Sequence, residues 1–157
     1  MEGRNILLSN LMKCQADIEQ LSRNKFADAV FLLQGERYDS AYYLAGYAIE
    51  LLLKARVCKT LGIEDFFDFG NINKKRLKNE PTLTKPYKVH DFEQLLILSG
   101  IYPDFERTLR GPVFKGHWSV VSKWNEDSRY LSGGTKADTE NFITSVREFI
   151  KWIQQHL

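Results

Sequence analysis

Apolar residues recur at helical spacing over the first part of the chain, from Leu7 to Leu33. This period predicts one long helix, or two helices separated by a break near Asn24. Gly35 directly follows the pattern and is expected to end it, because glycine favours the backbone conformations that terminate helices. The residues that carry the pattern are Leu7, Leu11, Cys14, Ile18, Leu21, Phe26, Ala29 and Leu33.

The next apolar pattern is the clearest in the chain and predicts a helix from near Asp39 to near Gly62. Asp39 is expected to cap its start, because a carboxylate accepts hydrogen bonds from the free N–H groups of a first turn. Two apolar stripes cover most of the circumference, so the helix should be contacted on several sides. A narrow polar strip remains, which includes Glu50 and, one turn later, Lys54.

Residues 63–89 differ from the segments on either side. Between Asn71 and Val89 there are six basic residues and one acid, Glu80, together with two prolines. This composition predicts a surface excursion with one short helical turn. Two interpretations remain open: a solvated connector, or a patch in which Lys74, Lys75 and Arg76 contact phosphate groups.

Short helical patterns separated by turn residues fill the rest of the chain. The expected elements are a helix over 90–100, a turn from Pro103 toward Leu109, a short helix with Trp118, Val121 and Trp124, a turn over 127–134, and a last helix capped by Thr135. No alternating strand pattern and no internal repeat is found. The predicted fold is a single all-α domain over 1–157, an up-and-down bundle of four to five helices with short extra helical turns.

Composition narrows the classes of function. A net charge of +2 at pH 7 is too small to indicate a nucleic-acid-binding protein by itself. Cys14 and Cys58 fall inside helical patterns and no Cys/His cluster is present, so we expect buried thiols and no metal. We expect no signal peptide, membrane span or cofactor, since neither the apolar runs nor the glycine motifs of such proteins occur. The expected location is the reducing cytoplasm.

One block of sequence resembles a known family. From Gly35 to Ala55 the chain has Gly-x-x-Tyr-x-x-Ala and then Tyr-x-x-x-x-Ala-x-Glu-x-x-Leu-Lys-Ala. This block is similar to that of HEPN domains (higher eukaryotes and prokaryotes nucleotide-binding), and His90-Asp91-Phe92 and Trp124 with Arg129-Tyr130 resemble later family elements. The resemblance implies a helical bundle that commonly forms homodimers.

The same resemblance implies two alternative functions. Many HEPN proteins are metal-independent endoribonucleases of toxin–antitoxin, phage-defence or RNA-processing systems. Others lack catalysis and serve as dimerisation or scaffold modules that bind a partner protein, often a nucleotidyltransferase, or a nucleotide. We therefore expect a protein that acts on or binds RNA, and keep the inactive module as the alternative.

Arg110 and His117 are the candidate catalytic pair. Active HEPN members carry an arginine followed, after four to six residues, by a histidine, and here six residues separate the two. Cleavage without metal needs a base for the ribose 2′-OH proton and a cation for the charge that develops on phosphorus. Histidine suits the first task and arginine the second. Gly111, Pro112 and Gly116 interrupt the segment, so the pair is not expected on one regular helix, and a packing histidine beside a surface arginine is the other interpretation.

Glu50 requires a partner, because an unpaired carboxylate on an apolar helix is costly to bury. Lys54 can supply one within the helix, and Arg129 can supply a bidentate one from the later loop. Either an ion pair holds that loop on the bundle, or Glu50, Arg129 and Tyr130 line a cleft for RNA or a nucleotide. For His90 we expect an N-terminal capping role rather than that of a base.

Overall fold

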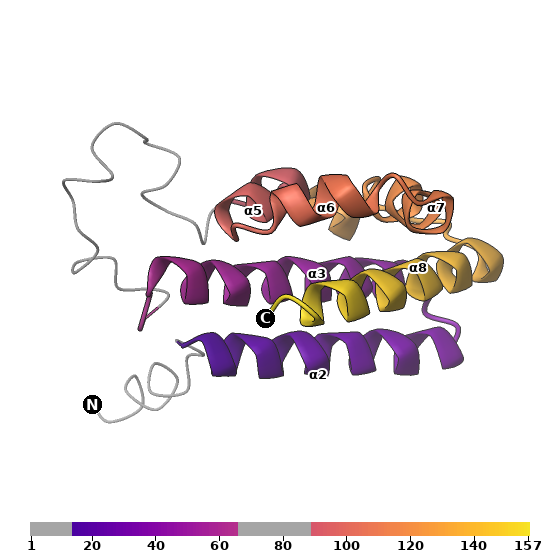
Figure 1. The fold of residues 1–157 in the computed structure, drawn as a ribbon. Coiled ribbons are helices and arrows are strands. Elements are labelled where there is room, and N and C mark those ends of the chain that lie inside the picture. The colour runs from indigo at the N-terminus through magenta and orange to yellow at the C-terminus, as the bar shows by residue number, and fades with distance from the viewer. Residues whose placement is uncertain (1–13, 66–88) are drawn as a thin grey trace, which may run out of the picture.

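The computed structural model describes residues 14–65 and 89–157. These residues form six α-helices and one 3-10 helix, with no strand among them, which confirms the all-α prediction. The elements are α2 (Gln15–Gln34), α3 (Tyr38–Leu61), α5 (Phe92–Leu98), α6 (Tyr102–Thr108), α7 (Pro112–Val121), the 3-10 helix η4 (Glu126–Tyr130) and α8 (Lys136–Gln154). Figure 1 shows α2 and α3 as an antiparallel hairpin, with α8 running in the direction of α3 and with α5, α6 and α7 following one another on the side of α3 away from α2.

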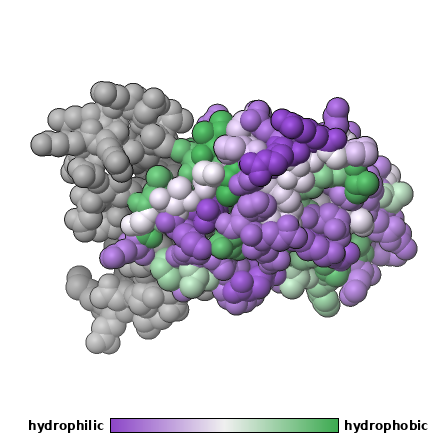
Figure 2. Space-filling model, viewed as in Figure 1, coloured by the Kyte–Doolittle hydropathy of each residue, from purple (hydrophilic) through white to green (hydrophobic). Residues whose placement is uncertain are grey.

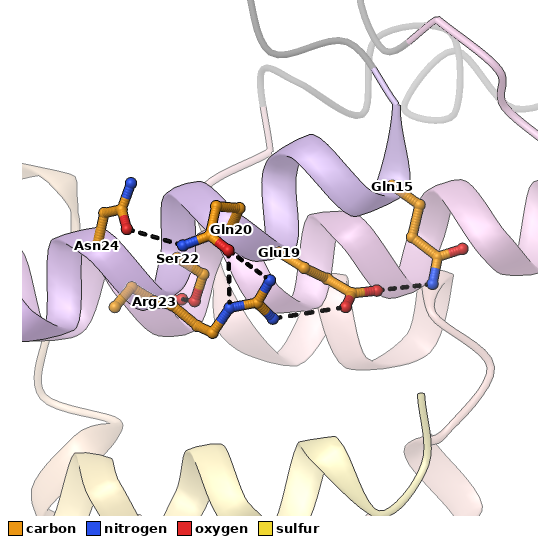
Figure 3. Close-up of polar contacts among 7 residues, drawn as sticks. Gln15, Glu19, Gln20, Ser22, Arg23 and Asn24 are labelled. Atoms are coloured by element: carbon orange, nitrogen blue, oxygen red, sulfur yellow. Dashed lines mark hydrogen bonds and ion pairs between the residues drawn. The ribbon is translucent and has the colours of Figure 1, made fainter.

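α2 runs without interruption through Asn24, so the alternative with a break there is wrong. Gly35 ends it as expected, while the predicted start at Leu7 lies outside the described residues. Its outer face carries a chain of polar contacts, of which Gln15 to Glu19 (2.7 Å) and Gln20 to Asn24 (2.9 Å) are examples (Figure 3). Its inner face is joined to α3 by the buried Ser22 hydroxyl, which donates to the Ala48 carbonyl at 2.6 Å.

α3 is the central element of the bundle and packs against α2, α5, α8 and η4. The expectation of contact on several sides is therefore confirmed. The helix ends at Gly62, whose φ of 64° is left-handed, and the following Ile63 N–H donates to the Cys58 carbonyl at 2.9 Å. A residue with this φ is most easily glycine, because a Cβ is disfavoured there.

The start of α3 differs from the prediction by two residues. Arg37 is the N-cap residue, and its carbonyl accepts from the Ala41 N–H at 2.9 Å. Asp39 is already inside the first turn, so it is not the cap. Its Oδ1 atom instead accepts a hydrogen bond from the Gly134 N–H at 2.8 Å, which joins the start of α3 to the segment before α8.

α5 and α8 lie where they were predicted, whereas α7 and η4 differ from the prediction. Asp91 caps α5, with its Oδ1 atom accepting from the Gln94 N–H at 2.8 Å, and Thr135 caps α8. α7 begins at Pro112 and ends at Val121, so Trp124 lies beyond the helix to which it was assigned. The 3-10 helix η4 occupies the first half of the segment 127–134, for which only a turn was expected.

Aromatic rings join α6, α7 and α8. Phe105 lies at the centre, with its ring 4.7 Å from that of Trp118 in an edge-to-face arrangement and 6.3 Å from that of Phe149. Such pairs add about 0.5–1.5 kcal/mol beyond the area they bury. The outside of the molecule mixes hydrophobic with hydrophilic residues on the face shown in Figure 2, and none of the helices in residues 14–65 and 89–157 has the length and apolar character of a bilayer span.

Candidate functional site

Arg110 precedes α7 and His117 lies within it, so the two residues are not on one helix. Arg110 is exposed in the turn between α6 and α7, and Gly111 is the N-cap residue of α7. His117 lies six residues further on and is half-buried on α7. At about 1.5 Å of rise per residue, the cap and His117 are separated by about 9 Å along the helix axis.

One ring nitrogen of His117 is held by α8. Its Nδ1 atom lies 3.2 Å from the hydroxyl oxygen of Ser145, which is buried. Among the residues that the structure describes, no hydrogen bond is formed by Nε2. A proton on Nδ1 leaves the lone pair of Nε2 available, which is the form of imidazole that can accept a proton.

The segment of sequence that contains His117 is basic. From Arg110 to Lys123 there are three basic residues, Arg110, Lys115 and Lys123, and no acid. Glu148 lies on α8 beyond Ser145, and its pKa is lowered, first by the hydrogen bond from Lys151 and further by the charges of Lys151 and His117. The salt bridge from Lys151 to Glu148 is 2.7 Å long. The acid nearest the site thus already has a cationic partner.

A second polar cluster lies inside the bundle around Glu50. Glu50 is 1% exposed and Lys54 is 4% exposed, so both are more deeply buried than the half-buried strip expected from the sequence. The Lys54 Nζ atom lies 2.6 Å from Glu50 Oε1, which confirms Lys54 as a partner within the helix. Removing one partner of such a buried pair strongly destabilises the folded protein, because the remaining charge loses its compensation.

His90 links this cluster to the surface. Its Nδ1 atom lies 2.9 Å from Glu50 Oε1, and its Nε2 atom lies 3.1 Å from Glu126 Oε2 on η4. Carboxylate oxygens only accept hydrogen bonds, so both contacts are fully formed when both ring nitrogens carry a proton. The capping role expected for His90 is wrong, since Asp91 caps α5 and the imidazole joins two carboxylates instead.

Trp124 anchors η4 on α3. Its ring stacks on that of Phe92 at 5.1 Å, and its Nε1–H donates to the Tyr43 carbonyl at 3.2 Å. The close approach requires Gly46, because a Cβ there would lie 2.3 Å from the indole ring. Glycine in the middle of a helix costs about 1 kcal/mol relative to alanine, so the packing of Trp124 explains why it is present.

Arg129 does not pair with Glu50, whose carboxylate is taken by Lys54 and His90. Arg129 is exposed, and its guanidinium lies over the Tyr130 ring at 5.0 Å from the centroid. Tyr130 itself is 76% exposed. The structure therefore separates the predicted set of Glu50, Arg129 and Tyr130 into a buried cluster and a surface pair. Lys74, Lys75 and Arg76 lie outside the described residues.

Two functional contacts were missed by sequence reasoning. The polarity of Glu50 on an apolar helix signalled that a partner was needed, but nothing local indicated His90, which is 40 residues away. Ser145 carried no signal at all, because it is a small residue in the apolar face of α8.

In comparisons with known proteins, no family model, no curated protein and no solved structure matches the chain. The resemblance to HEPN domains therefore rests on the sequence elements quoted above.

Proposed function

We propose that this chain is a HEPN-type protein that acts on RNA, in which Arg110 and His117 cleave the strand without a metal ion, as a component of a toxin–antitoxin or phage-defence system. The observation that supports this proposal best is the contact between His117 Nδ1 and Ser145 Oγ at 3.2 Å. This contact orients the ring and leaves Nε2 for chemistry. The acid-free segment from Arg110 to Lys123 suits a phosphate backbone.

The reaction assigns a separate task to each residue. Nε2 of His117 takes the proton of a ribose 2′-OH, and the 2′ oxygen then forms a bond to the adjacent phosphorus. Arg110 stabilises the negative charge on the phosphoryl oxygens as that bond forms. The bond from phosphorus to the 5′ oxygen breaks, and the departing oxygen takes a proton from solvent. The products are a 2′,3′-cyclic phosphate and a 5′-hydroxyl end.

His90 also has close polar partners, but its position suits structure better than catalysis. Both of its ring nitrogens contact carboxylate oxygens. A base needs a free lone pair within reach of the substrate proton. We therefore assign His90 to the packing of η4 against α3.

The proposal is tested by incubating the purified protein with a mixed-sequence single-stranded RNA in EDTA, followed by analysis of the ends produced. His117→Ala should lower the cleavage rate by about 10²–10⁴-fold, the range for loss of a general base. Arg110→Ala should lower it by about 10²–10³-fold, as for loss of one charge-stabilising group.

Two matched variants control for charge and for histidine content. Arg107→Ala removes an exposed arginine that pairs with Asp104, and His156→Ala removes a histidine at the end of the chain. Both should cleave at the wild-type rate. If the wild type cleaves nothing, or if all four variants cleave normally, the catalytic assignment is wrong and the inactive dimerisation or scaffold module becomes the better account.

A further inference from the structure

An open pocket of about 510 Å³ lies beside the turn that joins α2 to α3. This volume is within the range of roughly 300–1,000 Å³ that is usual for binding pockets. The lining includes no residue of α7 or α8, so the pocket is separate from the pair Arg110 and His117. Its lining residues are Leu32, Arg37, Asp39, Ser40, Tyr43, Leu44, Arg129 and Leu131.

Two exposed guanidinium groups, those of Arg37 and Arg129, line the pocket, and neither forms a salt bridge with any residue in the described ranges 14–65 and 89–157. The pKa of Arg129 is raised, first by a hydrogen bond with Tyr130 and further by the charge of Glu126. The one carboxylate in the lining, that of Asp39, accepts from the Gly134 N–H through Oδ1. A guanidinium offers a planar fork of donors that matches a carboxylate in geometry.

Apart from Ser40 and the hydroxyl of Tyr43, the remainder of the lining is apolar, and it continues onto the surface. Leu32 and Leu44 are half-buried, whereas Leu131 is 57% exposed. Tyr130, which precedes Leu131, is among the most exposed large hydrophobic residues described and lies under the Arg129 guanidinium. Exposed tyrosine and arginine beside apolar side chains are the composition that protein interfaces favour at their centres.

The backbone around the pocket is held in place from several directions. The Arg37 N–H donates to the Leu32 carbonyl at 2.8 Å, which closes the turn between the helices. Glu36 adopts a φ of 59° in this turn, a left-handed conformation that is uncommon outside glycine. Trp124 fixes η4 on α3 from the other side. A pocket arranged in advance loses less entropy when a ligand binds.

We propose that this pocket docks a segment of another protein that presents a carboxylate beside a leucine-sized or aromatic side chain. The carboxylate pairs with Arg37 and Arg129, and the apolar side chain packs among Leu32, Leu44 and Leu131. RNA fits less well, because a nucleotide strand offers no aliphatic side chain to pack among the three leucines of the lining. The pocket is thus an interaction surface distinct from the proposed site of RNA cleavage, and neither proposal depends on the other.

The test selects binders from a display library of random linear peptides on the full chain, with counter-selection on the variant Arg37→Gln/Arg129→Gln. Enriched peptides should carry Asp, Glu or a free C-terminal carboxylate close to Leu, Phe or Trp. After synthesis and labelling, the enriched peptides should bind the wild type more weakly as the salt concentration is raised, because the contact is partly ionic. Each single arginine variant should lose about tenfold in affinity.

Matched variants separate charge from position. Arg23→Gln/Arg107→Gln removes two exposed arginines on α2 and α6 and should leave peptide affinity unchanged, whereas Leu131→Ser should reduce it with no change in charge. Equal enrichment of acidic and neutral peptides, or equal binding to the wild type and to the Arg37→Gln/Arg129→Gln variant, would overturn the proposal. So would binding of a short single-stranded RNA that is lost only in that variant while no peptide is enriched.

Discussion

His90 and His117 have different hydrogen-bond partners, and the difference favours a structural role for His90 and a chemical role for His117. His90 lies between Glu50 and Glu126, with a ring nitrogen 2.9 Å from one carboxylate and the other 3.1 Å from the second. Among the described residues, the side chain of His117 forms one hydrogen bond, between Nδ1 and the Ser145 hydroxyl at 3.2 Å. A histidine with contacts at both ring nitrogens suits the joining of two structural elements. A histidine with one ring nitrogen left without a hydrogen bond suits proton exchange with a substrate.

The surroundings of the two histidines differ in the same sense. His90 connects the partly exposed carboxylate of Glu126, with 43% side-chain exposure, to the buried carboxylate of Glu50, with 1%. The segment from Arg110 to Lys123, which contains His117, has three basic residues and no acid, and Glu148 on α8 is paired with Lys151. The first arrangement stabilises the fold, because its charges are paired within the chain, and the second leaves charge available for an anionic ligand.

The largest expected effect on stability comes from breaking the buried pair. Lys54→Met keeps an unbranched side chain one atom shorter than lysine but removes the cation beside Glu50, so the free energy of unfolding should fall by about 3–5 kcal/mol. Urea unfolding measures it. The double variant Glu50→Leu/Lys54→Met removes both charges and should recover much of the loss. A loss below 1 kcal/mol for Lys54→Met would mean that the cluster is not the structural centre described above.

Alanine substitutions at two helical glycines should change stability by smaller amounts and in opposite directions. In Gly46→Ala the new methyl group would collide with Trp124, so the protein should lose about 1–3 kcal/mol despite the better helix propensity of alanine. In Gly116→Ala nothing lies within 4 Å of the added Cβ, so the protein should gain up to about 1 kcal/mol. Thermal unfolding of both variants gives the comparison. Shifts of the same sign would show that Trp124 does not pack as tightly against α3 as described.

The third prediction concerns the pH dependence of stability and the buried Cys58 thiol on α3. Burial raises the pKa of the Cys58 thiol to about 12 from its ordinary 9.0, with a further contribution from Cys14. The folded protein keeps this proton while the unfolded chain loses it above pH 9, so the contribution is complete below that pH and is lost as the pH rises toward 12. The expected slope is about 1.4 kcal/mol per pH unit.

Cys58→Ala is the control for this prediction, because it retains Tyr42 and Tyr47, whose pKa values burial also raises. The difference between wild type and variant in urea unfolding at pH 8 and pH 10 isolates the thiol. A difference that does not change with pH would contradict the prediction.

Local sequence was sufficient for most of the fold. Helical periodicity and end signals gave α3, α5 and α8 close to their observed bounds, because the caps at Asp91 and Thr135 and the left-handed Gly62 act within one turn of each helix end. Asn125 was a usable signal for η4 that was not recognised, since its side chain accepts from the Asp127 N–H at 2.9 Å.

The contacts between segments far apart in the sequence were not accessible in this way. Trp124 was assigned to a helix, whereas its place is fixed by the absence of a side chain at Gly46, 78 residues earlier in the sequence. Asp39 has the chemistry of a cap, but the backbone of Arg37 begins the helix and the Asp39 carboxylate binds Gly134. Such choices depend on which segments meet in three dimensions, and a single sequence does not report them.

The division between the two histidines is tested most directly by measuring RNA cleavage and urea unfolding on the same two variants. His117→Ala should reduce cleavage by at least about 100-fold and stability by about 0.5–1.5 kcal/mol, since it loses one hydrogen bond to a hydroxyl. His90→Ala should reduce stability by about 1.5–3 kcal/mol, since its contacts are to charged groups, and should cleave at close to the wild-type rate at a temperature where it remains folded. The reverse result, with cleavage lost in folded His90→Ala and retained in His117→Ala, would contradict the account and move the chemistry to the cluster around Glu50.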